Sequence, residues 1–317
     1  MNNKFKITVI DDMFLSSSQR DMIEKMGETK IFSGVPESKK EAMNRISNSN
    51  IITVGWTNIS DDMLKELPNL KLISVWASGY DYIDVISAKK RGVLVTNIPG
   101  YAAESVAEHT FTLIFALAKN LIKANSHVRS GEYQWKKFCG VELNSKTIGI
   151  IGTGSIGSKV AQIANCFGMR VIAYTKKPSE ERANKLNLEY VELEYLLKTS
   201  DIVTLHLPLT DSTSEMFTMN EFKLMKKTSF FINTARAAII NQNDLIQALN
   251  KGIMAGAGLD DIVNPTDVNN PLYLLDNVVL TPHNAFHTTE ALIRKTDICI
   301  SNIQSFINNS PQNVVNM

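Results

Sequence analysis

The sequence predicts an α/β protein with two doubly wound parallel sheets. Short apolar runs alternate along the chain with polar stretches in which apolar residues recur at helical spacing. In the first part of the chain the runs fall at 6–10, 51–54, 72–76 and 93–96, with helical segments at 23–26, 42–46 and 63–67. The alternation returns with runs at 148–151, 171–174, 202–206, 230–233, 255–259 and 278–280. Apolar runs separated by helices are typical of strands buried on both faces, as in a parallel sheet covered by helices.

The composition is that of an ordinary globular protein. Hydrophobic residues make up 44% of the 317 positions, charged residues make up 21%, and the formal net charge is +1. These values do not favour a nucleic acid or an anionic membrane as partner. The apolar run before residues 11–12 is too short for a signal peptide, and the run at 111–118 is too short to span a bilayer. Because Cys139, Cys166 and Cys299 lack metal-ligand spacing, we expect free thiols in a reducing cytoplasm and no metal site.

The most distinctive stretch is 146–157, which reads KTIGIIGTGSIG. A short buried strand runs into the glycine turn G-x-G-x-x-G, and a segment with helical spacing follows. In this order the first glycine permits a tight turn, the second lets a pyrophosphate approach the backbone, and the third lets the helix pack on the strand. The N–H groups at the start of the helix favour phosphate binding. The residues expected to hold a dinucleotide here are Gly152, Gly154, Ser155, Ile156 and Gly157.

The turn at 77–81 follows the apolar run at 72–76, where an open sheet binds its ligands. It is either a plain strand-to-helix turn or a set of backbone N–H groups that holds a small anion, and the turn alone favours the plain interpretation. Turn residues at 97–101 indicate a domain crossing. The following segment, 105–121, is apolar nearly all round, which predicts a buried helix that lies partly in a subunit interface.

Polar side chains stand at the ends of the later strand runs, and parallel strands bring such ends to one crevice. Arg236 follows the run at 230–233, and its permanent charge makes a core position unfavourable. It is either a surface arginine or a clamp for a carboxylate, and its place at the crevice favours the clamp. Lys176, Thr175 and Asp260 stand at other strand ends of the same crevice.

His283 follows Pro282 at the end of the run at 278–280. An imidazole there could exchange a proton with a reacting carbonyl, because histidine changes its charge near neutral pH. Spacing alone leaves the catalytic and the ordinary interpretation equally open. The other histidines are interpreted as satisfied or facing solvent: His109, His127, His206 and His287.

Eight runs in order make the chain resemble the D-isomer-specific 2-hydroxy acid dehydrogenase family over almost its whole length. They are GYDYID (79–84), RGVLVTNIPGY (91–101), ESVAEHT (104–110), IGIIGTGSIG (148–157), HLPLT (206–210), INTAR (232–236), GAGLD (256–260) and NVVLTPH (277–283). The first three look most similar to the branch of glycerate dehydrogenase, hydroxypyruvate reductase and phosphoglycerate dehydrogenase. Because the stretch after the matching runs is short, we expect no regulatory domain of the kind that many phosphoglycerate dehydrogenases carry.

The resemblance implies a Rossmann dinucleotide-binding domain at 99–287, inserted into a flavodoxin-like substrate domain made of 1–98 and 288–317, with a cleft between them. It implies an NAD(P)-dependent oxidoreductase that interconverts small 2-keto acids and D-2-hydroxy acids, with hydroxypyruvate and glyoxylate as leading substrates. The helix at 105–121 falls in the segment through which family members form homodimers. We therefore expect a homodimer with a small-molecule substrate.

The resemblance also implies individual roles. Arg236 would bind the carboxylate and carbonyl of the substrate, His283 would transfer the proton, and Asp260 would help hold the nicotinamide carboxamide. Backbone groups at Ser78 and Gly79 would complete the substrate cradle. Further cofactor-binding residues implied by the matching runs are Leu207, Pro208, Thr234 and Ala235.

One departure from the family concerns the glutamate that usually pairs with the catalytic histidine, five residues after the GLD aspartate. That place holds Pro265, and no glutamate lies between residues 260 and 267. Asn264 could orient His283 by a hydrogen bond but could not stabilise its charge, and a loop shift could instead bring in Asp261 or Asp267. On the first alternative, we expect a weaker acid whose keto-acid reduction declines at lower pH than in relatives with the pair.

The second departure concerns the cofactor. NAD sites place an acidic side chain on the ribose 2′-hydroxyl about twenty residues beyond the glycines. The corresponding strand end has no carboxylate before Glu180. Thr175 could donate to a 2′-phosphate, and Lys176 or Lys177 could pair with it. NADP is therefore slightly favoured over NAD, with a pair of solvated lysines beside an unselective NAD site as the alternative. A rival to the enzyme is a dinucleotide-binding sensor or corepressor-like protein with little activity, which the missing glutamate favours and the presence of Arg236 and His283 disfavours.

Overall fold

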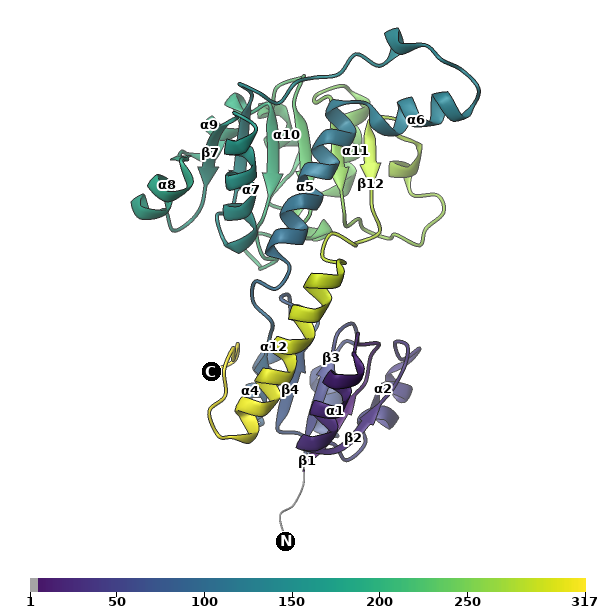
Figure 1. Cartoon of the computed structure of the whole chain (residues 1–317), viewed down its shortest axis with the longest axis vertical. Coiled ribbons are helices and arrows are strands. Elements are labelled where there is room, and N and C mark those ends of the chain that lie inside the picture. The colour runs from purple at the N-terminus through teal and green to yellow at the C-terminus, as the bar shows by residue number, and fades with distance from the viewer. Residues whose placement is uncertain (1–4) are drawn as a thin grey trace. The chain divides into compact units, whose positions relative to one another are not determined.

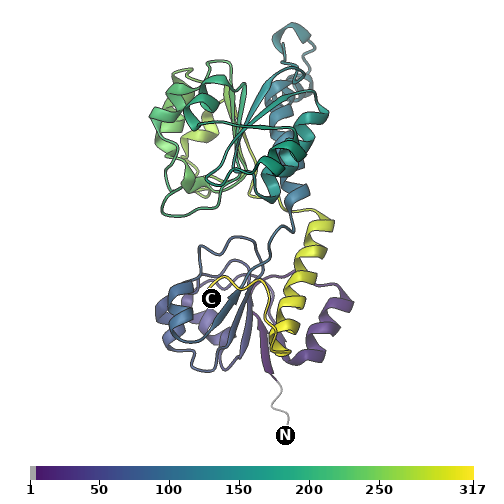
Figure 2. The same cartoon turned by 90° about the vertical axis from the view of Figure 1, so that its left-hand side faces the viewer.

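The computed structural model describes residues 5–317, and contacts divide the chain into two compact units. The first unit comprises the chain up to Tyr101 together with Thr288–Met317, and the second comprises Ala102–His287. Each unit is a parallel sheet with helices on both faces (Figures 1 and 2). The two doubly wound parallel sheets predicted from the sequence are therefore confirmed. Within residues 5–317, no helix is both long enough and apolar enough to cross a membrane.

The first unit holds five parallel strands in the order β2-β1-β3-β4-β5, which is the flavodoxin-like order. Its strands are β1 (Phe5–Val9), β2 (Gly27–Ile31), β3 (Ile51–Val54), β4 (Leu72–Val75) and β5 (Leu94–Thr96). Its helices are α1 (Ser17–Met26), α2 (Lys39–Ile46), α3 (Asp61–Lys65), α4 (Val85–Lys90) and α12 (Thr289–Ile307). Apolar residues of α2, α3 and α4 share one core on one face of the sheet, while α12 packs on α1 and β4.

Strand β2 was not among the predicted strands. In its sequence GETKI the exposed charged residues Glu28 and Lys30 alternate with buried or half-buried positions, as expected for a strand at the edge of the sheet with one covered face. The apolar-run criterion requires consecutive apolar residues and therefore misses β2, in which charged residues alternate with the others.

The second unit holds seven parallel strands in the order β12-β11-β10-β9-β6-β7-β8. These are β6 (Thr147–Ile151), β7 (Arg170–Tyr174), β8 (Glu189–Tyr190), β9 (Ile202–Leu205), β10 (Phe230–Asn233), β11 (Gly256–Leu259) and β12 (Val278–Leu280). The sequence predicted six of them and missed the short edge strand β8. The helices are α5 (Ala103–Ala118), α6 (Leu121–Arg129), α7 (Ser155–Cys166), α8 (Glu180–Leu186), α9 (Leu193–Thr199), α10 (Met219–Leu224) and α11 (Gln242–Asn250), with short 3₁₀ turns η1 (Trp135–Lys137), η2 (Ala237–Ile239) and η3 (Pro271–Leu274).

Two apolar cores sandwich this sheet. Side chains of α9, α10 and α11 form the core on one face, and side chains of α5 and α7 form the core on the other. Figure 1 shows α5 crossing the sheet beside β12, and the helix contacts β10, β11 and β12. The sheet thereby fixes α5 opposite the strands that carry the predicted catalytic residues.

The single helix predicted at 105–121 is shorter than expected. Helix α5 ends at Ala118, and Asn120 adopts the left-handed conformation with φ of 51°, which breaks the helix before α6 starts at Leu121. An asparagine tolerates this conformation better than most residues do. The helix therefore ends near Asn120, although the apolar pattern of the sequence continues to Leu121.

Candidate functional site

The glycine turn leads from β6 into α7 at the carboxyl edge of the seven-stranded sheet. Gly152 has φ of +96°, a conformation that favours glycine. A Cβ on Gly157 would lie 1.9 Å from the carbonyl oxygen of Gly152, so the helix packs on the turn only because residue 157 has no side chain. A Cβ on Gly154 would meet no atom within 4 Å.

These features fit a dinucleotide. The backbone is open at Gly154, and the first N–H groups of α7, at Ser155, Ile156 and Gly157, start a helix of 12 residues. Groups in the first turn of a helix have no partner within the helix and favour a phosphate. Leu207 and Pro208 follow the neighbouring strand β9, next to His206, whose carbonyl oxygen lies against Gly152.

His206 differs from the sequence interpretation of a satisfied or solvent-facing side chain. Its Nε2 lies 3.0 Å from the Thr204 hydroxyl, but its Nδ1 is buried without a hydrogen-bond partner. Burial lowers the pKa of His206 to about 3, so the imidazole is neutral at physiological pH. This histidine does not contribute a positive charge to the edge of the sheet.

The end of β7 carries Thr175 and Lys176, and the Lys176 ammonium donates to the Ser212 hydroxyl at 2.7 Å. A further cation was missed from the sequence. Arg182, in the first turn of α8, reaches back to the glycine turn, with Nη1 3.5 Å from the hydroxyl oxygen of Thr153. Its position seven residues beyond Thr175 gave no signal, because helix α8 folds it back toward the turn.

The loop after β10 holds Arg236 in a hydrogen-bonded turn. The Asn233 side chain accepts from the N–H of Ala235 at 2.9 Å and donates to the carbonyl of Arg236 at 2.9 Å. Arg236 Nη1 donates to the carbonyl of Ala235 at 3.0 Å, and the N–H of Ala237 donates to the carboxylate of Asp261 at 2.8 Å. This turn fixes the guanidinium at the same edge of the sheet as the glycine turn.

His283 stands in the loop after β12 with φ of +52°, which is unusual for a residue with a side chain. Asp260 stabilises this conformation. The N–H of His283 donates to the Asp260 carbonyl at 2.7 Å, and the Asp260 carboxylate accepts from the N–H groups of Asn284 (3.0 Å) and Ala285 (2.9 Å) and from the Thr281 hydroxyl (2.6 Å). Asp260 is only 2% exposed, so it positions the backbone around the imidazole.

Asp261 provides the carboxylate that the sequence did not place with certainty. Its Oδ1 lies 3.6 Å from Nδ1 of His283, while the contacts of Asn264 lie within its own loop, where its carbonyl oxygen is 3.4 Å from the Asn270 side chain. The structure therefore places Asp261, and not Asn264, beside His283. Burial opposes ionisation of Asp261, but hydrogen bonds from His283 and Ala237 and the charges of His283 and Arg236 lower its pKa.

The structure thus brings several of the expected residues to one edge of the second unit. The ends of β10, β11 and β12 are hydrogen-bonded neighbours, so Arg236, Asp261 and His283 follow adjacent strands. Within residues 5–317, no group of three or more His, Cys, Asp or Glu side chains is arranged to hold a metal ion.

Ser78 and Gly79 belong to the first unit and lie three and four residues beyond the end of β4. The Ser78 hydroxyl donates to the carbonyl of Ile98 at 2.6 Å, and the Asn97 side chain donates to the Ser78 carbonyl at 2.8 Å. These hydrogen bonds to residues 97 and 98 fix the turn, and the proton of the Ser78 hydroxyl is already used in one of them. The substrate cradle expected here therefore relies on backbone N–H groups rather than on the Ser78 hydroxyl.

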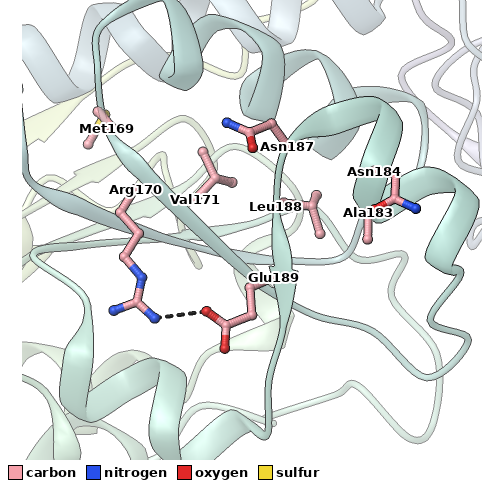
Figure 3. A pocket seen from close by; sticks show the side chains of 8 residues that line it. All are labelled: Met169, Arg170, Val171, Ala183, Asn184, Asn187, Leu188 and Glu189. Carbon is pink, nitrogen blue, oxygen red and sulfur yellow. Dashed lines mark hydrogen bonds and ion pairs between the residues drawn. The ribbon is translucent and has the colours of Figure 1, made fainter.

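A hollow of about 390 Å³ lies elsewhere in the second unit (Figure 3). It is bordered by Met169 and Arg170 at the start of β7, the end of the strand opposite to Thr175. The Arg170 guanidinium in this hollow is paired with the carboxylate of Glu189 at 2.8 Å. Because the charges of Arg170 and Glu189 are paired with each other, we assign no ligand to this hollow.

Comparison with known proteins agrees with this arrangement. Residues 111–285 match the sequence model of the D-isomer specific 2-hydroxyacid dehydrogenase NAD binding domain. A glyoxylate reductase of Thermococcus litoralis is 40% identical over 276 residues, covering 84% of this chain and 83% of the relative. A hydroxypyruvate reductase of Blautia hydrogenotrophica is 33% identical over 324 aligned positions, covering 98% of this chain and 99% of the relative.

Two solved structures are similar over 98% of this chain and 99% of their own. An acyclic imino acid reductase in complex with NADPH and D-Arg has a TM-score of 0.91 and 37% identity. A D-lactate dehydrogenase from Aquifex aeolicus, complexed with NAD and lactic acid, has a TM-score of 0.87 and 31% identity. With the glycine turn, the arginine and the histidine at the edge of one parallel sheet, these similarities show that the chain belongs to the D-isomer-specific 2-hydroxyacid dehydrogenase family.

Proposed function

We propose that this chain reduces small 2-keto acids, with hydroxypyruvate and glyoxylate as the leading substrates, to 2-hydroxy acids of the D series where the product is chiral. The observation that carries the proposal is the contact of Asp261 with both loops, through the N–H of Ala237 beside Arg236 and through Nδ1 of His283. One carboxylate thus links the loops of the expected carboxylate clamp and proton donor. Unit Ala102–His287 would bind the dinucleotide, and the first unit would form the substrate domain.

The reaction needs a hydride on the carbonyl carbon and a proton on its oxygen, and the bound nicotinamide supplies the hydride. Arg236 binds the substrate carboxylate with its forked guanidinium and polarises the carbonyl, because charge on the oxygen grows in the transition state. The His283 imidazolium donates the proton, and the neutral imidazole accepts one in the oxidising direction. Asp261 stabilises the imidazolium and orients its ring through Nδ1, which leaves Nε2 for the substrate.

The roles of the remaining residues follow from their places in the fold. Asp260 supports the loop of His283 and would help to hold the nicotinamide carboxamide of a bound cofactor. Backbone N–H groups at Ser78 and Gly79 bind the substrate carboxylate. Thr234, Ala235, Leu207 and Pro208 line the dinucleotide along the ends of β10 and β9.

We propose NADPH as the preferred cofactor. Lys176 and Arg182 place two cations near the end of β7 and the glycine turn, with Thr175 at the strand end. A 2′-phosphate on the adenosine ribose is favoured by such cations, whereas an NAD-specific site presents a carboxylate there. The similar structures include complexes with NADPH and with NAD, so the preference is tested directly on this chain.

We further propose a homodimer that functions in the cytoplasm. Helix α6 and the segment after it expose large apolar side chains: Leu121, Ile122, Val128, Tyr133 and Trp135. No residue of α6 is buried, so a second copy of this chain is a suitable cover for it. Cys139 and Cys166 are free and exposed thiols, which a reducing compartment preserves.

The decisive experiment measures oxidation of NADPH and NADH with hydroxypyruvate, glyoxylate, pyruvate and larger 2-keto acids. We expect turnover with the small acids, and its loss in Arg236→Ala and in His283→Ala. Dinucleotide binding without turnover on any acid would contradict the proposal and support the sensor instead. The names of the relatives, which are reductases and dehydrogenases, favour the enzyme.

A second candidate is reduction of an imine formed from a 2-keto acid and an amine. It is favoured by the similarity to the acyclic imino acid reductase over 98% of the chain. Assays with pyruvate and NADPH, with and without added ammonia or a primary amine, separate the two reactions by their products. An amino acid product would identify imine reduction, and a hydroxy acid product would identify keto-acid reduction.

A further inference from the structure

Helix α5 is mostly apolar but presents three polar side chains toward the sheet. Ser105 is 5% exposed and Thr110 is fully buried, and the His109 side chain is 17% exposed. Each contacts the end of a strand or the loop beyond it. The Ser105 hydroxyl donates to the carbonyl of Ala285 at 2.6 Å, His109 Nε2 lies 3.0 Å from the Thr281 hydroxyl, and the hydroxyl oxygens of Thr110 and Thr234 are 3.1 Å apart.

The hydrogen bond from His109 has a defined direction. The hydroxyl of Thr281 has a single proton, which it donates to the Asp260 carboxylate at 2.6 Å. His109 Nε2 must therefore carry a proton and donate to the Thr281 oxygen. The chain of bonds runs from α5 through Thr281 to Asp260, the residue that stabilises the backbone on both sides of His283.

The contact of Thr110 reaches the other loop. Because the Thr110 hydroxyl donates to the carbonyl of Val106 at 2.8 Å, its oxygen accepts the proton of the Thr234 hydroxyl. Thr234 lies two residues before Arg236, in the turn that Asn233 closes. Two consecutive residues of α5 therefore attach to the two loops that carry Arg236 and His283.

The position of α5 on the sheet is fixed by close packing on β11. A Cβ on Gly258 would lie 2.9 Å from Cβ of Leu113, and a Cβ on Gly256 would lie 3.3 Å from Cδ2 of Leu117. The two glycines let the helix approach the strand between β10 and β12. Because close packing holds α5 on the sheet, the helix can keep the loops after β10 and β12 in fixed positions.

We propose that Ser105, His109 and Thr110 are positioning residues that set the distance and orientation between Arg236 and His283. The proposal rests on the roles proposed above for those two residues. None of the three acts on the substrate directly. Thr110 supports the loop of the carboxylate clamp, whereas His109 and Ser105 support the loop of the proton donor, so their loss should change different kinetic constants.

Helix α5 also contains a matched control. The hydroxyl of Thr112 donates to the carbonyl of Glu108 at 3.0 Å, in the same way as Thr110 bonds to Val106, but Thr112 faces outward. Thr110→Val and Thr112→Val therefore remove the same group from the same helix, and only the first loses a bond to a catalytic loop. If the polar groups of α5 were no more than buried groups with satisfied hydrogen bonds, the substitutions would alter stability alone.

The test measures kcat and KM for hydroxypyruvate in each variant, with thermal unfolding in parallel. We expect Thr110→Val to raise KM about five- to tenfold with kcat nearly unchanged, and His109→Leu to lower kcat about tenfold with KM nearly unchanged. His109→Gln keeps an N–H donor at the place of Nε2 and Thr110→Ser keeps the hydroxyl, so both should restore most of the loss. Thr112→Val should match the wild type.

The proposal is overturned if Thr110→Val and His109→Leu behave like Thr112→Val, if kcat and KM change together in proportion to lost stability, or if the conservative variants do not restore activity. Failure of the proposed function is recognised separately. It shows as a wild type without turnover, or as Arg236→Ala and His283→Ala variants that remain active, and either result removes the basis of the positioning role as well. Activity that depends on Arg236 and His283, but not on His109 or Thr110, would contradict the positioning role and leave the proposed function intact.

Discussion

The carboxylate of Asp261 lies 3.6 Å from Nδ1 of His283 and accepts the N–H of Ala237, next to Arg236, at 2.8 Å. It therefore contacts both the proposed proton donor and the loop of the proposed substrate clamp. The charges of His283 and Arg236 help to lower the pKa of Asp261 in spite of its burial. In the proposed reaction, this contact places a carboxylate beside the imidazole that donates the proton.

Asp261→Asn removes this negative charge and keeps the shape of the side chain. The imidazolium loses its partner, so the high-pH decline of keto-acid reduction should move to lower pH by about one unit. Profiles of kcat against pH check this expectation. Asp267→Asn, in the exposed loop beyond, is the control, and an identical profile for both variants and the wild type would show that Asp261 does not assist the acid.

The two cations beyond β7 should control cofactor choice. Arg182→Ala and Lys176→Ala are each expected to raise KM for NADPH several-fold and leave KM for NADH nearly unchanged, because only the former cofactor has the 2′-phosphate. Thr175→Asp should shift preference toward NADH. Lys185→Ala, on the same helix α8, serves as control, and an unchanged NADPH-to-NADH ratio in all the variants would contradict the NADPH preference.

Two glycines of one turn should fail in different ways when replaced by alanine. Gly157→Ala places a Cβ 1.9 Å from a backbone oxygen, so it should lower the free energy of unfolding by a few kcal/mol. Gly154→Ala meets no protein atom within 4 Å and should fold normally, but it should weaken dinucleotide binding about tenfold or more. Urea unfolding and titration with NADPH separate the effects, and normal dinucleotide affinity in Gly154→Ala would argue against a pyrophosphate there.

Lys295 of α12 is buried with its ammonium 3.6 Å from the ring centre of Trp76. Burial lowers the pKa of Lys295 from 10.5 to about 7. Below pH 7 both the folded and the unfolded chain hold this proton, and folding buries a charge. Between about pH 7 and 10.5 the unfolded chain holds more protons, so the stability of the wild type rises with pH.

Lys295→Met should therefore raise the free energy of unfolding by roughly 1–3 kcal/mol at pH 6, and by less at pH 8.5. Urea unfolding at the two pH values measures this, with the exposed Lys25→Met as control. A variant that is less stable than the wild type at pH 6 would mean that the attraction between the ammonium and the aromatic rings exceeds the cost of burial.

The exposed apolar face of α6 should govern assembly. Ile122→Asp and Val128→Asp place charges among side chains that are 54% and 52% exposed in the isolated chain, so they should convert a dimer to a monomer while the fold is retained. Light scattering after size-exclusion chromatography reports the mass. A wild type that is already monomeric, at concentrations well above those of the assay, would reject the proposed dimer.

The sequence predicted most of the fold because its strands are apolar runs covered on both faces. The runs at 51–54, 230–233 and 278–280 coincide with β3, β10 and β12. The failures have local causes. Strand β2 was missed because it has a polar face at the edge of the sheet. The break between α5 and α6 was missed because it depends on the left-handed backbone conformation of Asn120, which an apolar pattern does not reveal.

The residues proposed for catalysis were predictable where they lie within three positions of the end of a strand. Arg236, Asp260 and His283 meet this condition, and the structure brings their strand ends together. Asp261 could not be chosen over Asn264 or Asp267 by counting, because the path of a loop decides which side chain reaches the histidine. Arg182 and His109 approach from helices, and their distances to Thr153 and Thr281 depend on how those helices pack.

The first unit takes its sheet from the beginning of the chain and α12 from the end. The C-terminal segment also caps the sheet, because Val314 forms an antiparallel bridge to Thr96 of β5 and Val315 donates to the carbonyl of Val95. During synthesis the second unit, an uninterrupted stretch from Ala102 to His287, can fold while the first still lacks one helix and its edge partner. The face of β4 that α12 covers can be buried only after residues 289–307 have been synthesised, so the two units differ in when all of their parts are available.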